Sequence, residues 1–320
     1  MHHDGHPPGT RTIRRVATIV GALLAPLTVA AALTGCGSSV AAAQPGKILA
    51  VGAENEYANV ISQIGGRYVQ VSAIMSDPNT DPHTFEASPS VAEEVSRAQL
   101  VVQNGVGYDD FMSKIESASS NDKRQVIDVQ QLEHLPDSTP NPHLWYKPTT
   151  MPLVAGALVA DLSALAPGHA AYFRANAARF DASLRPWTQA LKRFAATYPG
   201  AAVATTEPVA DYMLQAAGVD NLTPFSMQAD IMNGTDPAPQ AVSLQNALLS
   251  GHRVRAFVYN QQVTDSVTRE FLNHARAAGI PVVGVYETMP TPGYDYQSWM
   301  IAELQALQRA VAHGKSTTKL

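Results

Sequence analysis

The 320-residue sequence lacks the features of several common protein classes. It contains one cysteine, Cys36, so no disulfide can form within the chain. After the first forty residues no apolar run is long enough to cross a bilayer. The formal net charge is -5 and Lys/Arg-rich runs are absent, which argues against a nucleic-acid partner because phosphate binding needs a basic surface. The composition, 45% hydrophobic and 15% charged, is that of a globular protein.

Several enzyme motifs are absent as well. The chain has no His-Glu-x-x-His helix, no Gly-x-Ser-x-Gly turn and no phosphate-binding glycine loop. These absences argue against an enzyme.

The N-terminus is typical of a secretory signal, because basic residues precede an apolar stretch over residues 16–33 that Pro26 interrupts. The next residues, Leu33-Thr34-Gly35-Cys36, resemble the lipobox of bacterial lipoproteins, in which the cysteine becomes the first mature residue and carries acyl chains. We therefore expect a signal peptide over residues 1–35 and a lipid anchor at Cys36. The alternative is an unmodified secreted protein. Three histidines precede the cleavage site and are not ligand candidates: His2, His3 and His6.

The mature chain begins with a predicted flexible tether over residues 36–46, which is rich in Ser and Ala. Short β-rich runs then alternate with helical patterns, which is typical of βαβ units and a parallel sheet. We expect an N-terminal α/β lobe over residues 47–149. Its expected strands are 48–51, 69–74, 100–103 and 126–128, and its expected helices are 57–64 and 90–96.

Helical periodicity without strand signals fills residues 150–198, with helices predicted over 150–165 and 169–198. A helix of about thirty residues would span about 45 Å, which is longer than one small lobe is wide. We interpret it as a long rigid linking helix. Pro186 argues against this interpretation, because proline removes a backbone hydrogen bond and kinks or breaks a helix.

The alternation of strands and helices resumes after Pro199-Gly200 and predicts a C-terminal α/β lobe over residues 199–313. Residues 230–239, which contain two prolines, are expected to form an exposed loop, and the tail over 314–320 has no packing signal. The predicted strands are 201–205, 256–259 and 281–285, and the predicted helices are 209–217, 241–249, 263–278 and 296–311.

Two histidines follow prolines at the edges of the first lobe. His83 lies in Asp81-Pro82-His83 and His143 in Asn141-Pro142-His143. Each proline restricts the backbone around its histidine, so the imidazole is held with little freedom. Neutral imidazole is a good ligand for divalent transition metals, so these two residues are candidate metal ligands.

Two acids follow predicted strands of the second lobe. Glu207 comes after the strand over 201–205, and Glu287 comes after the strand over 281–285. Ligands of open α/β sheets bind at the carboxyl ends of the strands, so both acids could meet the histidines in one crevice. Each could instead be an ordinary acid at a helix start.

These motifs resemble, over nearly the whole mature chain, the zinc/manganese solute-binding lipoproteins of bacterial ABC importers, the cluster A-I periplasmic binding proteins. The matching stretches occur in the family's order. They are Gly52-Ala53-Glu54-Asn55-Glu56-Tyr57, Ile64-Gly65-Gly66, Asp81-Pro82-His83-Thr84-Phe85-Glu86, Val102-Gln103-Asn104-Gly105-Val106-Gly107-Tyr108, Asn141-Pro142-His143-Leu144-Trp145 and Val285-Tyr286-Glu287-Thr288.

The resemblance implies two α/β lobes with mainly parallel sheets, joined by a long rigid helix of the helical-backbone metal-receptor type, with one divalent metal ion held between them. It implies His83, His143, Glu207 and Glu287 as ligands, with Asp295 in reserve for the last position. The implied partners are an ABC importer permease and its ATPase. We expect a monomer anchored to the outer face of the cell membrane.

The metal's identity stays open. Two imidazoles and two carboxylates suit tetrahedral Zn²⁺, and also Mn²⁺ if the carboxylates bind through both oxygens. Zinc is slightly favoured on intrinsic affinity. The chain lacks a His-rich acidic loop and has Lys147 where an acid is frequent in the family. Two functions are alternatives to metal transport. One is a metal-stabilised surface adhesin or structural lipoprotein, and the other is a metallohydrolase.

Overall fold

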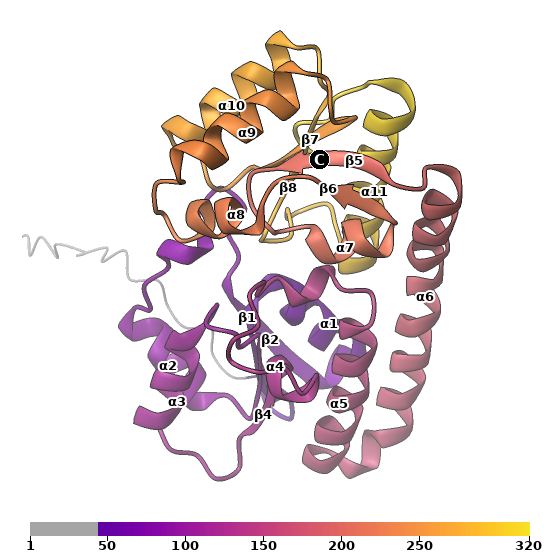
Figure 1. Ribbon diagram of the computed structural model, residues 1–320. Coiled ribbons are helices and arrows are strands. Elements are labelled where there is room, and N and C mark those ends of the chain that lie inside the picture. Colours follow the sequence, from indigo (N-terminus) through magenta and orange to yellow (C-terminus); the bar gives the residue numbers. More distant parts are fainter. Residues whose placement is uncertain (1–43) are drawn as a thin grey trace, which may run out of the picture. The chain divides into compact units, whose positions relative to one another are not determined.

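The computed structural model describes residues 44–320 (Figure 1). The predicted signal peptide, Cys36 and most of the predicted tether lie outside these residues. No helix within residues 44–320 has the length and apolarity needed to cross a membrane.

The N-terminal lobe is built on a parallel sheet in the order β2-β1-β3-β4. Its helices alternate with the strands, as the sequence predicts. The elements are β1 (Ile48–Glu54), α1 (Asn55–Gly65), β2 (Val69–Met75), α2 (Pro89–Arg97), β3 (Leu100–Gln103), α3 (Asp110–Ala118), β4 (Gln125–Asp128), α4 (Val129–Leu132) and α5 (Thr150–Leu165), with short 3-10 segments at Gly66–Tyr68, Pro82–Thr84, Leu144–Tyr146 and Pro167–His169.

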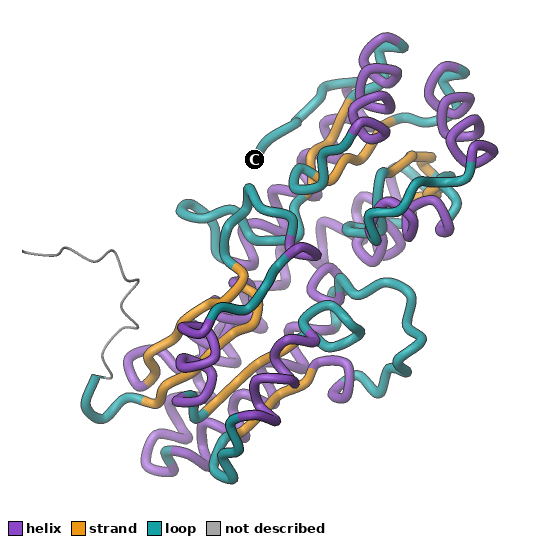
Figure 2. Tube along the Cα trace, turned by 90° about the vertical axis from the view of Figure 1, so that its left-hand side faces the viewer, coloured by secondary structure: helices purple, strands orange, loops and turns teal. Residues whose placement is uncertain are grey.

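The C-terminal lobe contains a second parallel sheet in the order β6-β5-β7-β8. The strands of the two sheets form two separate groups in Figure 2. After α6 (Ala170–Thr197), the elements are β5 (Ala201–Thr205), α7 (Asp211–Ala216), β6 (Val219–Asn221), α8 (Phe225–Met232), α9 (Pro239–Ser250), β7 (Ala256–Asn260), α10 (Ser266–Ala277), β8 (Val282–Val285) and α11 (Tyr296–His313).

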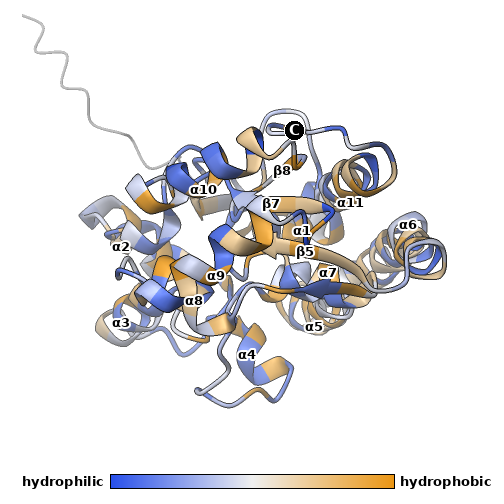
Figure 3. Ribbon diagram, turned by 45° about the horizontal axis from the view of Figure 1, so that its top comes forward, coloured by the Kyte–Doolittle hydropathy of each residue, from blue (hydrophilic) through white to orange (hydrophobic). Residues whose placement is uncertain are grey.

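Helical spacing of apolar residues explains how the helices cover the sheets. In α1, Tyr57, Val60, Ile61 and Ile64 are fully buried, and their spacing of three or four residues places them on one face. The outer helices α9 and α10 show both hydrophilic and hydrophobic faces in Figure 3. The buried faces of the helices therefore hold the strands in place, and with them the residues at the carboxyl ends of the strands.

Helix α6 contacts both lobes: it packs against α1 and α5 of the first and against α7 and α11 of the second. Its buried residues recur every three or four positions from Phe173 to Phe194, so one continuous stripe faces the core. The predicted long helix is confirmed, and the objection from Pro186 does not hold, because the helix continues through this residue. Pro186 is exposed, so water can reach the carbonyl that lacks an N–H partner.

Two further expectations need correction. Residues 230–232 are not an exposed loop but the last part of α8, in which Ile231 is buried. The tail does pack: Thr317 pairs with Val283 at the edge of the second sheet, and Leu320 contacts the core. Four elements were not predicted from the sequence: the helices α3, α4 and α8 and the three-residue strand β6.

Candidate metal centre

His83 is positioned by a short 3-10 turn after β2. The Asp81 side chain accepts a hydrogen bond from the His83 backbone N–H at 2.9 Å and so caps the turn. Pro82 begins the turn and is buried. The His83 side chain keeps 21% of its surface exposed, so this imidazole lies on the side of the centre that solvent can reach.

His143 is positioned by Asn141, two residues before it. The Asn141 side-chain oxygen accepts from the His143 backbone N–H at 3.0 Å and lies 2.8 Å from the ring Nδ1. The Asn141 amide nitrogen donates to the Pro208 carbonyl of the second lobe, which fixes the orientation of the amide. Nδ1 therefore carries the proton, and Nε2 presents its lone pair.

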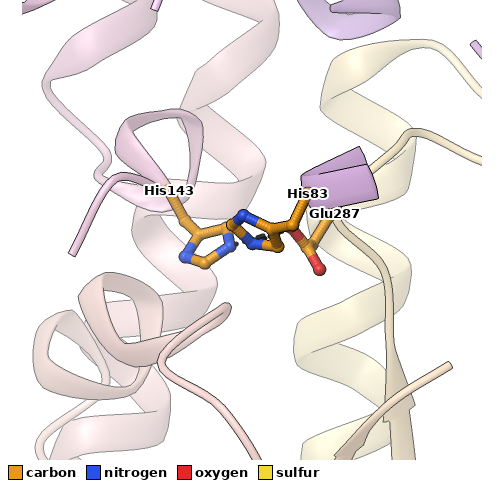
Figure 4. A group of neighbouring side chains, drawn as sticks. All are labelled: His83, His143 and Glu287. Carbon is orange, nitrogen blue, oxygen red and sulfur yellow. Dashed lines mark hydrogen bonds and ion pairs between the residues drawn. The ribbon is translucent and has the colours of Figure 1, made fainter. Parts of the chain in front are cut away.

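Glu287 follows β8, and Gln262 holds its backbone. The Gln262 side-chain oxygen accepts from the backbone N–H groups of Glu287 and Thr288 at 2.7 and 2.8 Å. The carboxylate is fully buried. Its Oε2 lies 3.1 Å from Nε2 of both His83 and His143, so residues from both lobes meet at one oxygen (Figure 4).

The ligand atoms of His83, His143 and Glu287 all lie within 4.8 Å of one another. Atoms that bind one metal tetrahedrally at about 2.0–2.1 Å stand about 3.3 Å apart, close to the two 3.1 Å separations. A neutral His143 also points a lone pair at an anionic oxygen, which is a repulsive arrangement that a cation between them would resolve. The donor set and its geometry therefore fit a divalent transition metal.

Burial and charge set the protonation of the three groups. Burial opposes protonation of the His83 imidazole and so lowers its pKa, but the Glu287 carboxylate beside it raises the His83 pKa overall. Burial dominates at His143 and lowers its pKa, so this imidazole is neutral near pH 7. Burial would raise the Glu287 pKa, yet the His83 imidazole beside it, whose own pKa is raised, holds it below its usual range. The centre thus presents an anionic oxygen and a neutral imidazole.

Glu207 lies next to this group but is not part of it. It is buried, and its Oε1 accepts at 3.2 Å from the Asn260 side-chain amide, which also donates to Glu287. Burial raises the Glu207 pKa well above its usual value, and the Glu287 charge adds to the rise. Its Oε2 has no hydrogen-bond partner among the described residues. Glu207 as the fourth ligand stays a prediction.

Asp295 occupies a different position. It is the N-cap of α11, where its carboxylate accepts from the Ser298 backbone N–H at 2.8 Å in a capping box. The carboxylate is thereby engaged in capping the start of the helix. Lys147 likewise pairs with Glu133 near the start of α5.

Three residues that surround the carboxylates were not predicted from the sequence. Tyr108 donates to Glu287 Oε2 at 3.0 Å, Asn260 donates to Oε1 at 2.6 Å, and Gln262 holds the Glu287 backbone. Asn260 is the last residue of β7, so the strand-end rule that indicated Glu207 and Glu287 applies to it as well. Tyr108 lies within one of the stretches that carry the family resemblance.

Comparisons with known proteins agree with this architecture. The manganese-binding lipoprotein MntA of Bacillus subtilis (strain 168) is 29% identical over 172 residues, which are 52% of this chain and 56% of that protein. A putative metal-binding protein of Chlamydia muridarum is 29% identical over 122 residues, 38% of this chain and 44% of that protein. The matched region thus spans about half the length of these curated relatives.

Solved structures show the same fold. The solute-binding protein FpvC of Pseudomonas aeruginosa, in complex with Mn²⁺, has a TM-score of 0.68 at 19% identity, covering 83% of this chain and 98% of that one. The periplasmic zinc-binding protein TroA of Treponema pallidum also has a TM-score of 0.68 at 19% identity, covering 84% and 100%. At these identities the likeness concerns the fold alone.

A family profile gives the assignment. The family described as zinc-uptake complex component A periplasmic, ZnuA, matches residues 51–310, which take in both sheets, the linking helix and all three side chains of the centre. The resemblance seen in the sequence motifs is thereby confirmed. The chain belongs to the ZnuA family of periplasmic Zn/Mn-binding solute-binding proteins.

Proposed function

We propose that this protein captures one divalent transition metal ion outside the cytoplasm and delivers it to the permease of an ABC importer, with the ATPase driving transport. The observation that carries the proposal is the convergence of His83, His143 and Glu287 within 4.8 Å. Proteins of the ZnuA family are binding components of transport systems, which confirms the expectation that the chain is not an enzyme.

The proposed ligands are His83, His143 and Glu287, with Glu207 completing the set. Two imidazole nitrogens and two carboxylate oxygens suit zinc in a tetrahedral site. We favour zinc slightly over manganese, because this donor set binds zinc more tightly by intrinsic affinity. Relatives described as binding either metal support both candidates.

Capture and release follow from where the ligands lie. The partly exposed His83 is where an arriving ion first meets the centre, and the buried His143 and Glu287 then complete its coordination. Because ligands come from both lobes, a permease that alters the lobe contact would change the coordination and release the ion. The lipobox and the description of MntA as a lipoprotein support an anchor at Cys36 on the outer face of the cell membrane. We also propose that the chain acts as a monomer.

Calorimetric titration of the metal-free protein with zinc and with manganese tests this function. Wild type should bind one ion, and His143→Ala should lose at least about a hundredfold in affinity because a ligand is removed. His274→Ala is the matched control, since this histidine lies on α10 with its Nδ1 2.7 Å from the Asn246 side-chain oxygen. Equal losses in both variants, or no binding by wild type, would overturn the proposal.

Cellular uptake tests delivery. Cells that carry the His143→Ala chain in place of wild type should take up radioactive zinc or manganese more slowly at limiting metal, whereas His274→Ala should match wild type. Uptake that is independent of the chain would contradict the role in import.

A further inference from the structure

The side-chain amide of Asn260 joins the two acids of the second lobe. Its nitrogen donates to Glu287 Oε1 at 2.6 Å and to Glu207 Oε1 at 3.2 Å. Asn260 is the last residue of β7 and only 1% exposed. An amide nitrogen has two hydrogens, so each carboxylate receives one of them.

The orientation of this amide is determined by its surroundings. The Asn260 side-chain oxygen accepts from the Gln262 backbone N–H at 3.0 Å, and the Asn260 backbone N–H donates to Thr206 Oγ1 at 3.0 Å. A flipped amide would place oxygen against two carboxylates and lose the bond to Gln262. The nitrogen therefore faces the acids.

Each carboxylate consequently has one oxygen, Oε1, that accepts from Asn260. In Glu287, Oε1 is held by Asn260, while Oε2 faces the two imidazoles and also accepts from the Tyr108 hydroxyl at 3.0 Å. In Glu207, Oε1 is held by the same amide, and Oε2 has no hydrogen-bond partner among the described residues although it is buried. If a metal bound through both oxygens of either acid, Oε1 would have to share its lone pairs between the ion and the Asn260 amide, which weakens that second metal–oxygen bond.

We propose that Asn260 is a selectivity-determining positioning residue that restricts both acids to one oxygen each and so favours a four-coordinate ion over one with more ligands. This role rests on the proposed function. Zinc accepts two nitrogens and two single oxygens in a tetrahedron, whereas manganese favours six ligands, mostly oxygen. The amide thus acts against manganese by competing with the ion for the Oε1 atoms of both acids.

Three variants test the role. Asn260→Asp keeps an acceptor for Gln262 but, when ionised, donates nothing to the glutamates. Asn260→Ala removes the amide altogether. Asn221→Ala is the matched control, because the Asn221 amide also donates to a carboxylate of the second lobe, Asp211, at 2.9 Å, but outside the centre.

The measurement is the ratio of zinc affinity to manganese affinity, obtained by competition with a chelator. Second-layer partners of metal ligands affect binding by about 10–100-fold, so both Asn260 variants should lower the ratio by at least about tenfold. The control should leave it unchanged. X-ray absorption spectra should show about four first-layer atoms around zinc in wild type and more around manganese in the variants than in wild type.

The outcomes separate the two proposals. If wild type binds neither metal, the proposed function fails and the role of Asn260 fails with it. If wild type binds metal but both Asn260 variants keep its affinity ratio and coordination numbers, only the role of Asn260 is overturned. A general loss of affinity for both metals at a constant ratio also overturns it, because that result indicates a purely structural residue.

Discussion

Replacing Glu303 with glutamine should stabilise the metal-free protein at alkaline pH and change it little near pH 5. Glu303 lies on α11 and is fully buried. Its Oε1 accepts from Trp299 Nε1 at 2.9 Å and from the Tyr146 hydroxyl at 3.3 Å, while Oε2 has no hydrogen-bond partner among the described residues. Burial raises the pKa of this carboxyl to about 8, so at neutral pH it is held as the uncharged acid.

The magnitude follows from the pKa difference between the folded and unfolded chains. The unfolded chain loses this proton near pH 4.5, whereas the folded chain keeps it up to about pH 8. Between those values the folded state holds more protons, so the free energy of unfolding falls as the pH rises. The integrated loss reaches up to about 4 kcal/mol at pH 8 and about 1 kcal/mol or less at pH 5. Glutamine keeps the shape and the acceptor but cannot ionise.

Urea unfolding of wild type and Glu303→Gln at pH 5, 6.5 and 8 measures the effect. The advantage of the variant should grow with pH, and its midpoint should be highest relative to wild type at pH 8. Glu93→Gln on α2 is the control, because that side chain is 61% exposed and its replacement should have no comparable pH-dependent effect. Parallel pH profiles for wild type and Glu303→Gln would refute the reasoning.

Two further predictions concern metal binding. Asn141→Ala should weaken binding by about 10–100-fold, because it removes the acceptor that holds His143 Nδ1–H; chelator competition measures this, and an affinity equal to that of wild type would contradict it. Affinity should fall from about pH 7.5 to about pH 5.5, because both imidazoles must be neutral to bind and the raised pKa of His83 moves its protonation toward neutral pH. Calorimetry at both pH values checks this, and a constant affinity would exclude a histidine site.

The regular elements could largely be predicted from the sequence where apolar periodicity is strong. Helix α5 and strand β5 have the predicted bounds, because each carries an unbroken pattern between clear boundaries. Strand β6 was missed because it has three residues, of which only Val219 is buried. Helix α6 was placed correctly, but its continuity through Pro186 depends on which face is exposed, and that is a tertiary property.

The centre was predictable only in part. The prolines before His83 and His143 are visible in the sequence, and they indicate that the backbone carrying each imidazole has little freedom. The bond between Tyr108 and Glu287 joins residues 179 positions apart, which no local pattern reports. Asn260 bonds to two acids from different strand ends, so its importance appears only when the strands are assembled. Glu207 Oε2 has no hydrogen-bond partner within residues 44–320, and this too is a property of the folded interior.

The distance along the chain between Glu287 and its contact His143 links metal affinity to folding. His143 and Glu287 are 144 residues apart in sequence, so an unfolded chain cannot hold an ion between them. Any ion that binds only the folded form adds its binding free energy to the free energy of unfolding, about 4 kcal/mol at a thousandfold excess over the dissociation constant. Shifts in melting temperature therefore rank zinc, manganese and competing ions without a transport assay. Removing the ion with a chelator would make the protein easier to unfold.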